Sequence, residues 1–310
     1  MNLRIASQSV VKADNDLFAN NVERLNEDAL FIGDNLFAIA DGAGGTGILA
    51  NKWAEKLLSC IPVKPFQSPK ALNNWILGFW EDFYIEHIST LQHDHWQLNK
   101  FEDEGSSATL ASIWHLAGNN FEYNSYGDSA LFIYNKQSGT LRIQQNLASI
   151  NSFTGSPPLL NWKSEEIDEK HFYREKFMLE PDEIAILATD GIAMYIYGAY
   201  LTCTNTIKEE IQERKMQSIV NYFRKNPPDD FKSLMQIIHS SLNSKESFSQ
   251  LTRDWHKNKC LPNDDYTLIW IEKKISEDHS HTKLAGKPLV YDFNNDRFYR
   301  NLKRRVPKKL

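Results

Sequence analysis

The sequence predicts an α+β protein in which antiparallel strands and helices occupy different stretches of the chain. Between residues 108 and 145, short apolar runs alternate with turns that contain glycine or asparagine, which is typical of tightly connected antiparallel strands. On either side of this region, apolar residues recur at steps of three and four, which is the period of an amphipathic helix.

The first third of the chain is expected to form three strands followed by two helices. The strands are apolar runs, the second and third of which are separated by a Gly33-Asp34-Asn35 turn: residues 3–11, 29–32 and 36–40. One helix is expected over residues 48–60. After a break that contains three prolines, the aromatic spacing predicts one long helix along residues 72–83, with its aromatic side chains in the core.

The remainder alternates between strands and helices. Four strands are expected in the middle of the chain: residues 108–116, 121–126, 130–134 and 141–145. Residues 151–182 show no period and predict an irregular connection. A buried strand is then expected over 183–188, mainly helices over about 192–244, and a last strand over 266–271.

Composition excludes several classes of protein. No run of about 18 apolar residues is present, which argues against a transmembrane helix, and the first ten residues are too polar for a signal peptide. The three cysteines, Cys60, Cys203 and Cys260, are scattered, which fits a reducing cytoplasm and neither a disulfide scaffold nor a zinc site. We therefore expect a cytoplasmic protein without a membrane contact.

Charge is distributed unevenly along the chain. The 35 Lys and Arg and 40 Asp and Glu give a net charge of −5, but residues 271–310 carry 11 basic and 5 acidic residues, or +6, which leaves −11 for the rest. An acidic body argues against a nucleic-acid partner. The stretch 297–310 has seven basic residues and no acidic one. It predicts a solvated tail, or a contact with an acidic partner or with the acidic body of the chain itself.

Five acidic turns stand directly beside apolar strands. They are Asn26-Glu27-Asp28, Asp41-Gly42, Gly127-Asp128-Ser129, Asp190-Gly191 and Asp264-Asp265. Carboxylates at strand ends are held in place and can converge on one cluster of cations. Because their oxygens are hard ligands, they favour Mg²⁺ or Mn²⁺ over zinc. The glycine-rich segment 42–47 could instead be a nucleotide-binding loop, but its spacing fits the dinucleotide fingerprint poorly.

In order and spacing, these turns resemble the metal-dependent protein phosphatases of type 2C, the PPM family. The matching segments are Asn26 to Asp28, Leu36 to Gly45, Gly105 to Thr109, Tyr126 to Ser129, Ile186 to Gly191 and Asn263 to Thr267. The resemblance implies a four-layer α-β-β-α sandwich, with two central antiparallel sheets flanked by helices. It places a phosphatase domain at residues 1–272, with a helical insert at about 192–260, and leaves 273–310 as a basic C-terminal extension.

The resemblance also implies a ligand set for two Mn²⁺ or Mg²⁺ ions and for a weaker third site. Asp41 would bridge the two metals and the carbonyl of Gly42 would bind one of them. Asp190 and Asp264 would complete the direct ligands, and these three aspartates would be the catalytic residues. The remaining positions are Glu27 and Asp28, which would act through bound waters, and Asp128, which with Asp190 would form the third site.

Three departures from the family pattern point to a divergent bacterial subgroup. The arginine that usually grips the substrate phosphate is replaced by Glu23, and Arg24 beside it is the candidate for that role. Ala43 stands where some members carry a histidine proposed as the general acid, so no general acid is assigned. A second aspartate that often follows the later Asp-Gly pair is missing from residues 192–194.

The resemblance implies hydrolysis of phosphoserine or phosphothreonine on proteins by a water activated at a dinuclear metal centre. Two other interpretations stay open. The chain could be a non-catalytic protein with a phosphatase fold, although the intact Asp41, Asp190 and Asp264 argue against this. It could also be a phosphatase of small phosphorylated molecules, since the arginine is shifted and helices are inserted between Asp190 and Asp264.

Overall fold

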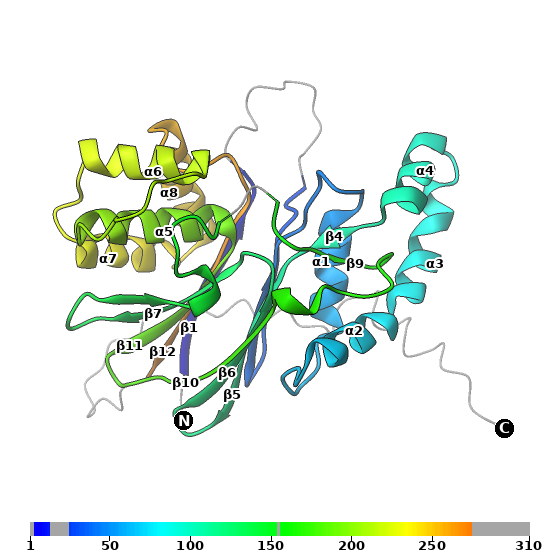
Figure 1. The fold of residues 1–310 in the computed structure, drawn as a ribbon, viewed down its shortest axis with the longest axis horizontal. Helices are drawn as coiled ribbons and strands as arrows, with labels where there is room; N and C mark the ends of the chain where they lie inside the picture. Colours follow the sequence, from blue (N-terminus) through cyan, green and yellow to red (C-terminus); the bar gives the residue numbers. More distant parts are fainter. Residues whose placement is uncertain (1–2, 13–24, 154–155, 275–310) are drawn as a thin grey trace. The chain divides into compact units, whose positions relative to one another are not determined.

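The computed structural model describes residues 3–12, 25–153 and 156–274. Its central strands are apolar on both faces, so they need cover on both sides. In β3 (Leu36–Ala40) all five residues are buried. Phe37 and Ile39 pack into a core shared by two sheets, while Leu36 and Ala38 pack into a second core beneath helices. The chain therefore stacks helices, sheet, sheet and helices, which confirms the predicted four-layer sandwich (Figure 1).

Among the described residues, each of the two sheets has five strands, and every neighbouring pair is antiparallel. The first sheet has the order β1 (Leu3–Val10), β12 (Tyr266–Lys273), β11 (Glu183–Ala188), β7 (Ala130–Asn135) and β8 (Leu141–Ile143). The second has the order β10 (Phe172–Met178), β6 (Asn120–Tyr126), β5 (Leu110–Ala117), β3 and β2 (Ala29–Ile32). A short pair joins β4 (Ser107–Ala108) to β9 (Leu160–Asn161).

In the described part of the chain, two groups of four helices cover the outer faces. On one side, at the right of Figure 1, lie α1 (Ala50–Ser59), α2 (Pro69–Leu77), α3 (Trp80–Leu91) and α4 (His95–Glu104). On the other lie α5 (Asp190–Cys203), α6 (Arg214–Lys225), α7 (Phe231–Ser241) and α8 (Lys245–Lys257). Within the described ranges, no helix is long and apolar enough to cross a membrane.

The predicted long helix over residues 72–83 is wrong. The chain leaves α2 at Gly78, and Phe79 takes a non-helical conformation with φ −146° before α3 begins. The break does not interrupt the aromatic packing, because Phe79 and Phe83 both contact the ring of the fully buried Trp53. The apolar spacing thus follows from a shared core and not from one continuous helix.

The predicted irregular connection over residues 151–182 is also wrong in part, because it contains the seven-residue strand β10. This strand lies at the edge of its sheet and exposes Arg174 and Lys176. Its other face carries the charged Glu175 between two aromatic residues. An edge strand of this kind lacks the apolar run by which the central strands are recognised.

Candidate metal centre

Strand register gathers the acidic turns at one end of the sandwich. In the second sheet Ala40 pairs with Ala29, so Asp41 at the end of β3 lies beside Asp28 at the start of β2. In the first sheet Ala188 pairs with both Leu268 and Ala130. The end of β11, the start of β12 and the β6–β7 turn therefore meet at one edge. They bring Asp190, Asp264 and Asp128 together.

Asp41 is held by its backbone. Its N–H donates to Thr109 Oγ1 at 3.3 Å, and the N–H of Thr109 donates to the Asp41 carbonyl at 2.8 Å. Next to it, the N–H of Gly42 donates to the Glu27 carbonyl at 3.1 Å. A Cβ on Gly42 would lie 2.5 Å from that same carbonyl oxygen and 2.8 Å from the carbonyl carbon of Ala50. Only glycine allows the three segments to approach so closely.

Two of the carboxylates are buried with an oxygen that lacks a partner. Asp28 is 8 % exposed and Asp128 is 4 % exposed. Among the described residues, nothing donates a hydrogen bond to Oδ1 of either. The other oxygen of Asp28 accepts a hydrogen bond of 3.0 Å from Thr189 Oγ1. Buried carboxylate oxygens without donors are costly unless a proton or a cation compensates them.

The carboxylates also repel one another. Burial raises the pKa of Asp41 well above its ordinary value, and the charges of Asp28, Asp190, Asp128 and Asp264 raise it further. Burial likewise raises the pKa of Asp190 to about 6, with Asp264 as the next cause. Burial is also the main cause that raises the pKa values of Asp28 and Asp128. A cation bound among these groups would relieve this repulsion.

Lys215, at the start of α6, is a residue of the cluster that sequence reasoning missed. Its Nζ lies 3.1 Å from Asp264 Oδ2 and 3.7 Å from Asp190 Oδ2. Although burial lowers it, these two carboxylates raise the pKa of Lys215 above its usual value. No motif marks this lysine, since it stands 49 residues before Asp264 in a helical stretch. Only the packing of α6 brings it to the cluster.

Asp265 has a structural role that its neighbour Asp264 does not share. It is 3 % exposed, and its two oxygens accept hydrogen bonds from the backbone N–H groups of Lys12 at 2.8 Å and Glu27 at 2.7 Å. It thus joins the start of β12 to the end of β1 and to the first acidic turn. The ammonium nitrogen of Lys12 also lies 3.7 Å from Glu27 Oε2. Asp265 therefore positions Glu27.

The cluster fits a hard divalent cation in donor chemistry and in charge. Its acidic side chains offer only carboxylate oxygens, two of which are buried without a donor, and they repel one another. Within the described part of the chain, no three Asp, Glu, His or Cys side chains are grouped as a finished ligand set. Instead, the Lys215 ammonium lies against Asp190 and Asp264.

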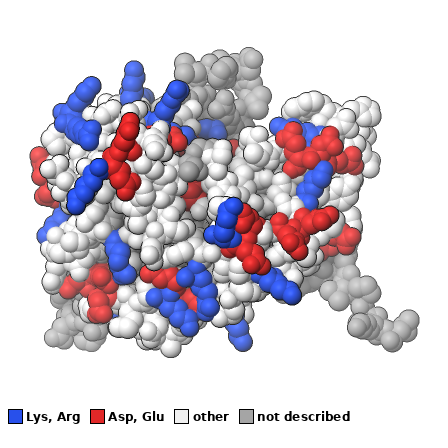
Figure 2. All heavy atoms as spheres, in the orientation of Figure 1, with Lys and Arg blue, Asp and Glu red and all other residues white. Residues whose placement is uncertain are grey.

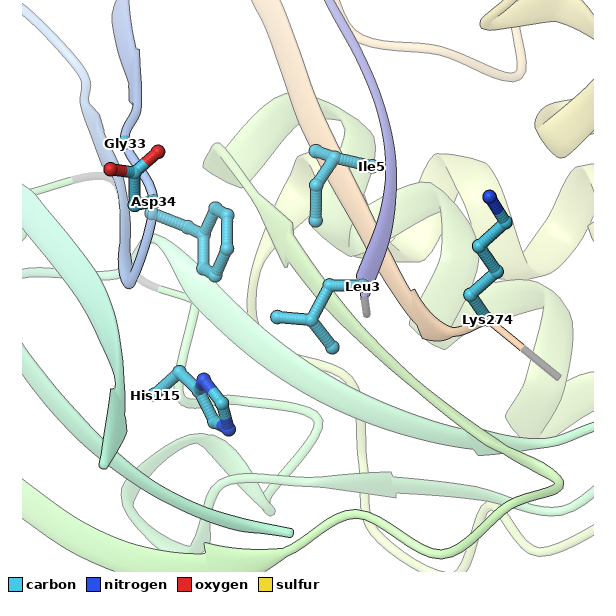
Figure 3. A pocket seen from close by; sticks show the side chains of 7 residues that line it. Leu3, Ile5, Gly33, Asp34, His115 and Lys274 are labelled. Atoms are coloured by element: carbon cyan, nitrogen blue, oxygen red, sulfur yellow. The ribbon is translucent and has the colours of Figure 1, made fainter. Parts of the chain in front are cut away.

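One predicted site residue cannot be placed, and a pocket of the described chain opens away from the acidic cluster. Arg24, the candidate for the phosphate grip, falls outside the described residues. A pocket of about 380 Å³ opens at the other end of the sandwich, between the start of β1, the β2–β3 turn and the end of β5 (Figure 3). Its lining includes Leu3, Asp34 and His115 and none of the clustered aspartates. The acidic cluster is recognised by its buried carboxylates, which repel one another.

Comparisons with known proteins give structural matches alone. No protein-family model matches the chain, and no curated protein matches it. PppA of Pseudomonas aeruginosa, described as a key regulatory component of its T6SS, is 16 % identical, with a TM-score of 0.49 over 88 % of this chain and 98 % of its own. The serine/threonine phosphatase PstP/Ppp of Mycobacterium tuberculosis is 15 % identical, with a TM-score of 0.45 over 87 % and 98 %.

A third solved structure is MsPP of Mycobacterium smegmatis, a PPM Ser-Thr phosphatase in complex with cacodylate. It is 13 % identical, with a TM-score of 0.46 over 87 % of this chain and 97 % of its own. The matched structures thus include phosphatases of the family that the sequence resembles. Because the identities are low and the TM-scores lie below 0.5, the function must be argued from the site itself.

Proposed function

We propose that this chain is a Mn²⁺- or Mg²⁺-dependent phosphatase that hydrolyses phosphoserine and phosphothreonine on proteins. One observation carries the proposal: Asp41 lies within electrostatic reach of Asp28, Asp128, Asp190 and Asp264 at one end of the sandwich. These residues come from five separate turns. A protein that needed only a stable fold would gain nothing from gathering five carboxylates that repel one another.

Each residue of the cluster has a proposed part in holding the metals. Asp41 and the carbonyl of Gly42 would bind directly, as would Asp190 and Asp264. The others would act through waters or at a third site: Glu27, Asp28 and Asp128. When bound, the ions supply Lewis acidity, which lowers the pKa of a coordinated water and offsets negative charge on the phosphoryl group.

The protein itself contributes rigidity and orientation. The two hydrogen bonds with Thr109 fix the backbone of Asp41, and Asp265 fixes that of Glu27. Thr189 holds one oxygen of Asp28, so that the other remains available. These contacts preorganise the ligands before an ion or a phosphate arrives.

We also propose that the substrate is a phosphoprotein and that the chain acts in the cytoplasm, where cysteine thiols stay reduced. The three cysteines are all free. On the face drawn in Figure 2, acidic and basic side chains are intermixed over the helices. The basic stretch 297–310, which lies outside the described residues, is proposed to contact an acidic partner. A chain that ends at residue 296 should lose such binding and keep its activity on a small aryl phosphate.

Hydrolysis assays test the proposal. Purified protein should hydrolyse phosphoserine and phosphothreonine peptides with Mn²⁺ and lose this activity in EDTA. Asp41→Asn should abolish most of it, whereas Asp34→Asn, an equal change in the exposed β2–β3 turn at the other end, should not. Activity on an aryl phosphate without activity on phosphopeptides would favour a small phosphorylated substrate. Inactivity on both, with Mn²⁺ bound, would refute phosphatase function.

A further inference from the structure

Lys215 carries an inference about how many divalent ions the cluster holds. Its ammonium contacts Asp190 and Asp264 through the Oδ2 atom of each, at 3.7 and 3.1 Å. Both are residues that the proposed function makes direct metal ligands. A lysine ammonium and a divalent cation are competing counter-ions for the same carboxylate oxygens.

The position of Lys215 is fixed by helix packing. Asp190 is the first residue of α5, and α6 lies against that helix at Gly198, where a Cβ would be 2.7 Å from Ile219 Cγ2. At the start of α6, the Glu213 carboxylate accepts a hydrogen bond of 3.1 Å from the N–H of Lys215. The packing of the two helices therefore holds the Lys215 ammonium beside the two carboxylates.

The side chain of Lys215 can nevertheless move away from the carboxylates. It is 42 % exposed, whereas the side chain of Asp190 is 14 % exposed. A lysine with this exposure can swing into water without disturbing the core, because its charge stays solvated. The ammonium can thus leave when an ion with two charges arrives, but the ion must first displace it.

We infer that Lys215 is an internal counter-ion that competes with a divalent metal for Asp190 and Asp264. It neutralises the metal-free cluster and weakens metal binding at that position, so that wild-type protein fills the Asp190–Asp264 position last. The inference rests on the proposed metal centre and adds to it a residue that selects how many ions are bound at a given concentration.

Calorimetric titration with Mn²⁺ tests this on the full chain. Lys215→Met removes the charge and keeps most of the stem, so it should bind Mn²⁺ more tightly by on the order of tenfold at one site, or bind an additional ion per chain. Lys225→Met, the same change at the far end of α6, should bind as wild type does. Lys215→Arg keeps the charge and should stay close to wild type.

Thermal unfolding provides the second readout. Metal-free Lys215→Met should unfold at a lower temperature than wild type, because Asp190 and Asp264 lose their cation, and Mn²⁺ should raise its midpoint by more. Equal Mn²⁺ affinity and stoichiometry in wild type and Lys215→Met would overturn the inference while leaving the metal centre intact. Weaker binding by Lys215→Met would also overturn it. Failure of every variant to bind Mn²⁺ would refute the metal centre itself, and the inference with it.

Discussion

Thr189→Val should destabilise the fold and loosen the acidic cluster at the same time. Thr189 is fully buried between β11 and α5. Its hydroxyl donates to Asp28 Oδ2 at 3.0 Å and accepts from the N–H of Thr267 at 3.0 Å. Valine has nearly the same shape but makes neither bond. The loss combines one hydrogen bond to a carboxylate, worth about 1.5–3 kcal/mol, with a neutral one worth about 0.5–1.5 kcal/mol.

The free energy of unfolding should therefore fall by about 2–4.5 kcal/mol, which for a chain of this size is a drop in midpoint of roughly 4–9 °C. Thermal unfolding followed by circular dichroism in EDTA measures it. Thr252→Val is the matched control, since Thr252 is also buried but its hydroxyl donates only to Ser249 in its own helix. Equal midpoints for the two variants would refute the role given to the Thr189 hydroxyl.

The acidic cluster and the glycine beside Asp41 give three further predictions. Gly42→Ala should lower the free energy of unfolding by about 1–3 kcal/mol, because the added Cβ meets backbone atoms that cannot move aside. Gly45→Ala is the control: its Cβ would have no neighbour within 4 Å, so the variant should unfold at the wild-type temperature. Asp190→Asn and Asp264→Asn should each weaken Mn²⁺ binding in calorimetry and lower kcat at least about a hundredfold, and wild-type values for both would contradict their assignment as ligands. Because burial and Asp264 raise the pKa of Asp190 to about 6, its contribution to stability is complete below its ordinary value of 3.8 and is lost as the pH rises through about 6. Melts of the metal-free protein should show this fall, and a midpoint that rises over this range would contradict it.

Individual strands could be predicted where they are continuous apolar runs with acidic turns at their ends, whereas the four-layer sandwich could be expected only from the resemblance to a known family. Residues 36–40 and 183–188 are of this kind, and the structure places both strands as expected. Strand β10 could not be predicted this way. It lies at the edge of its sheet and carries charged residues, so it shows no continuous apolar run. The break at Gly78 could not be predicted either, since the aromatic side chains on both sides of it enter the same core and keep the helical spacing.

Some residues of the candidate site could be predicted from the sequence, and others could not. Strand-end aspartates can be seen in the sequence because each turn is local, and register then brings them together. Asp264 and Asp265 are adjacent, yet one faces the ammonium of Lys215 and the other accepts two backbone N–H groups. The role of Asp265 depends on segments more than 200 residues away, Lys12 and Glu27, whereas Asp264 contacts Lys215 at a separation of 49. The place of Lys215 beside Asp264 depends on the packing of α6, and such packing leaves no motif in the sequence.

Anomalous diffraction from crystals grown with Mn²⁺ shows whether the carboxylates gathered around Asp41 form a metal centre. We expect an anomalous peak in contact with the Asp41 carboxylate and the Gly42 carbonyl oxygen. A map from saturated crystals with no peak at this end of the sandwich would contradict it.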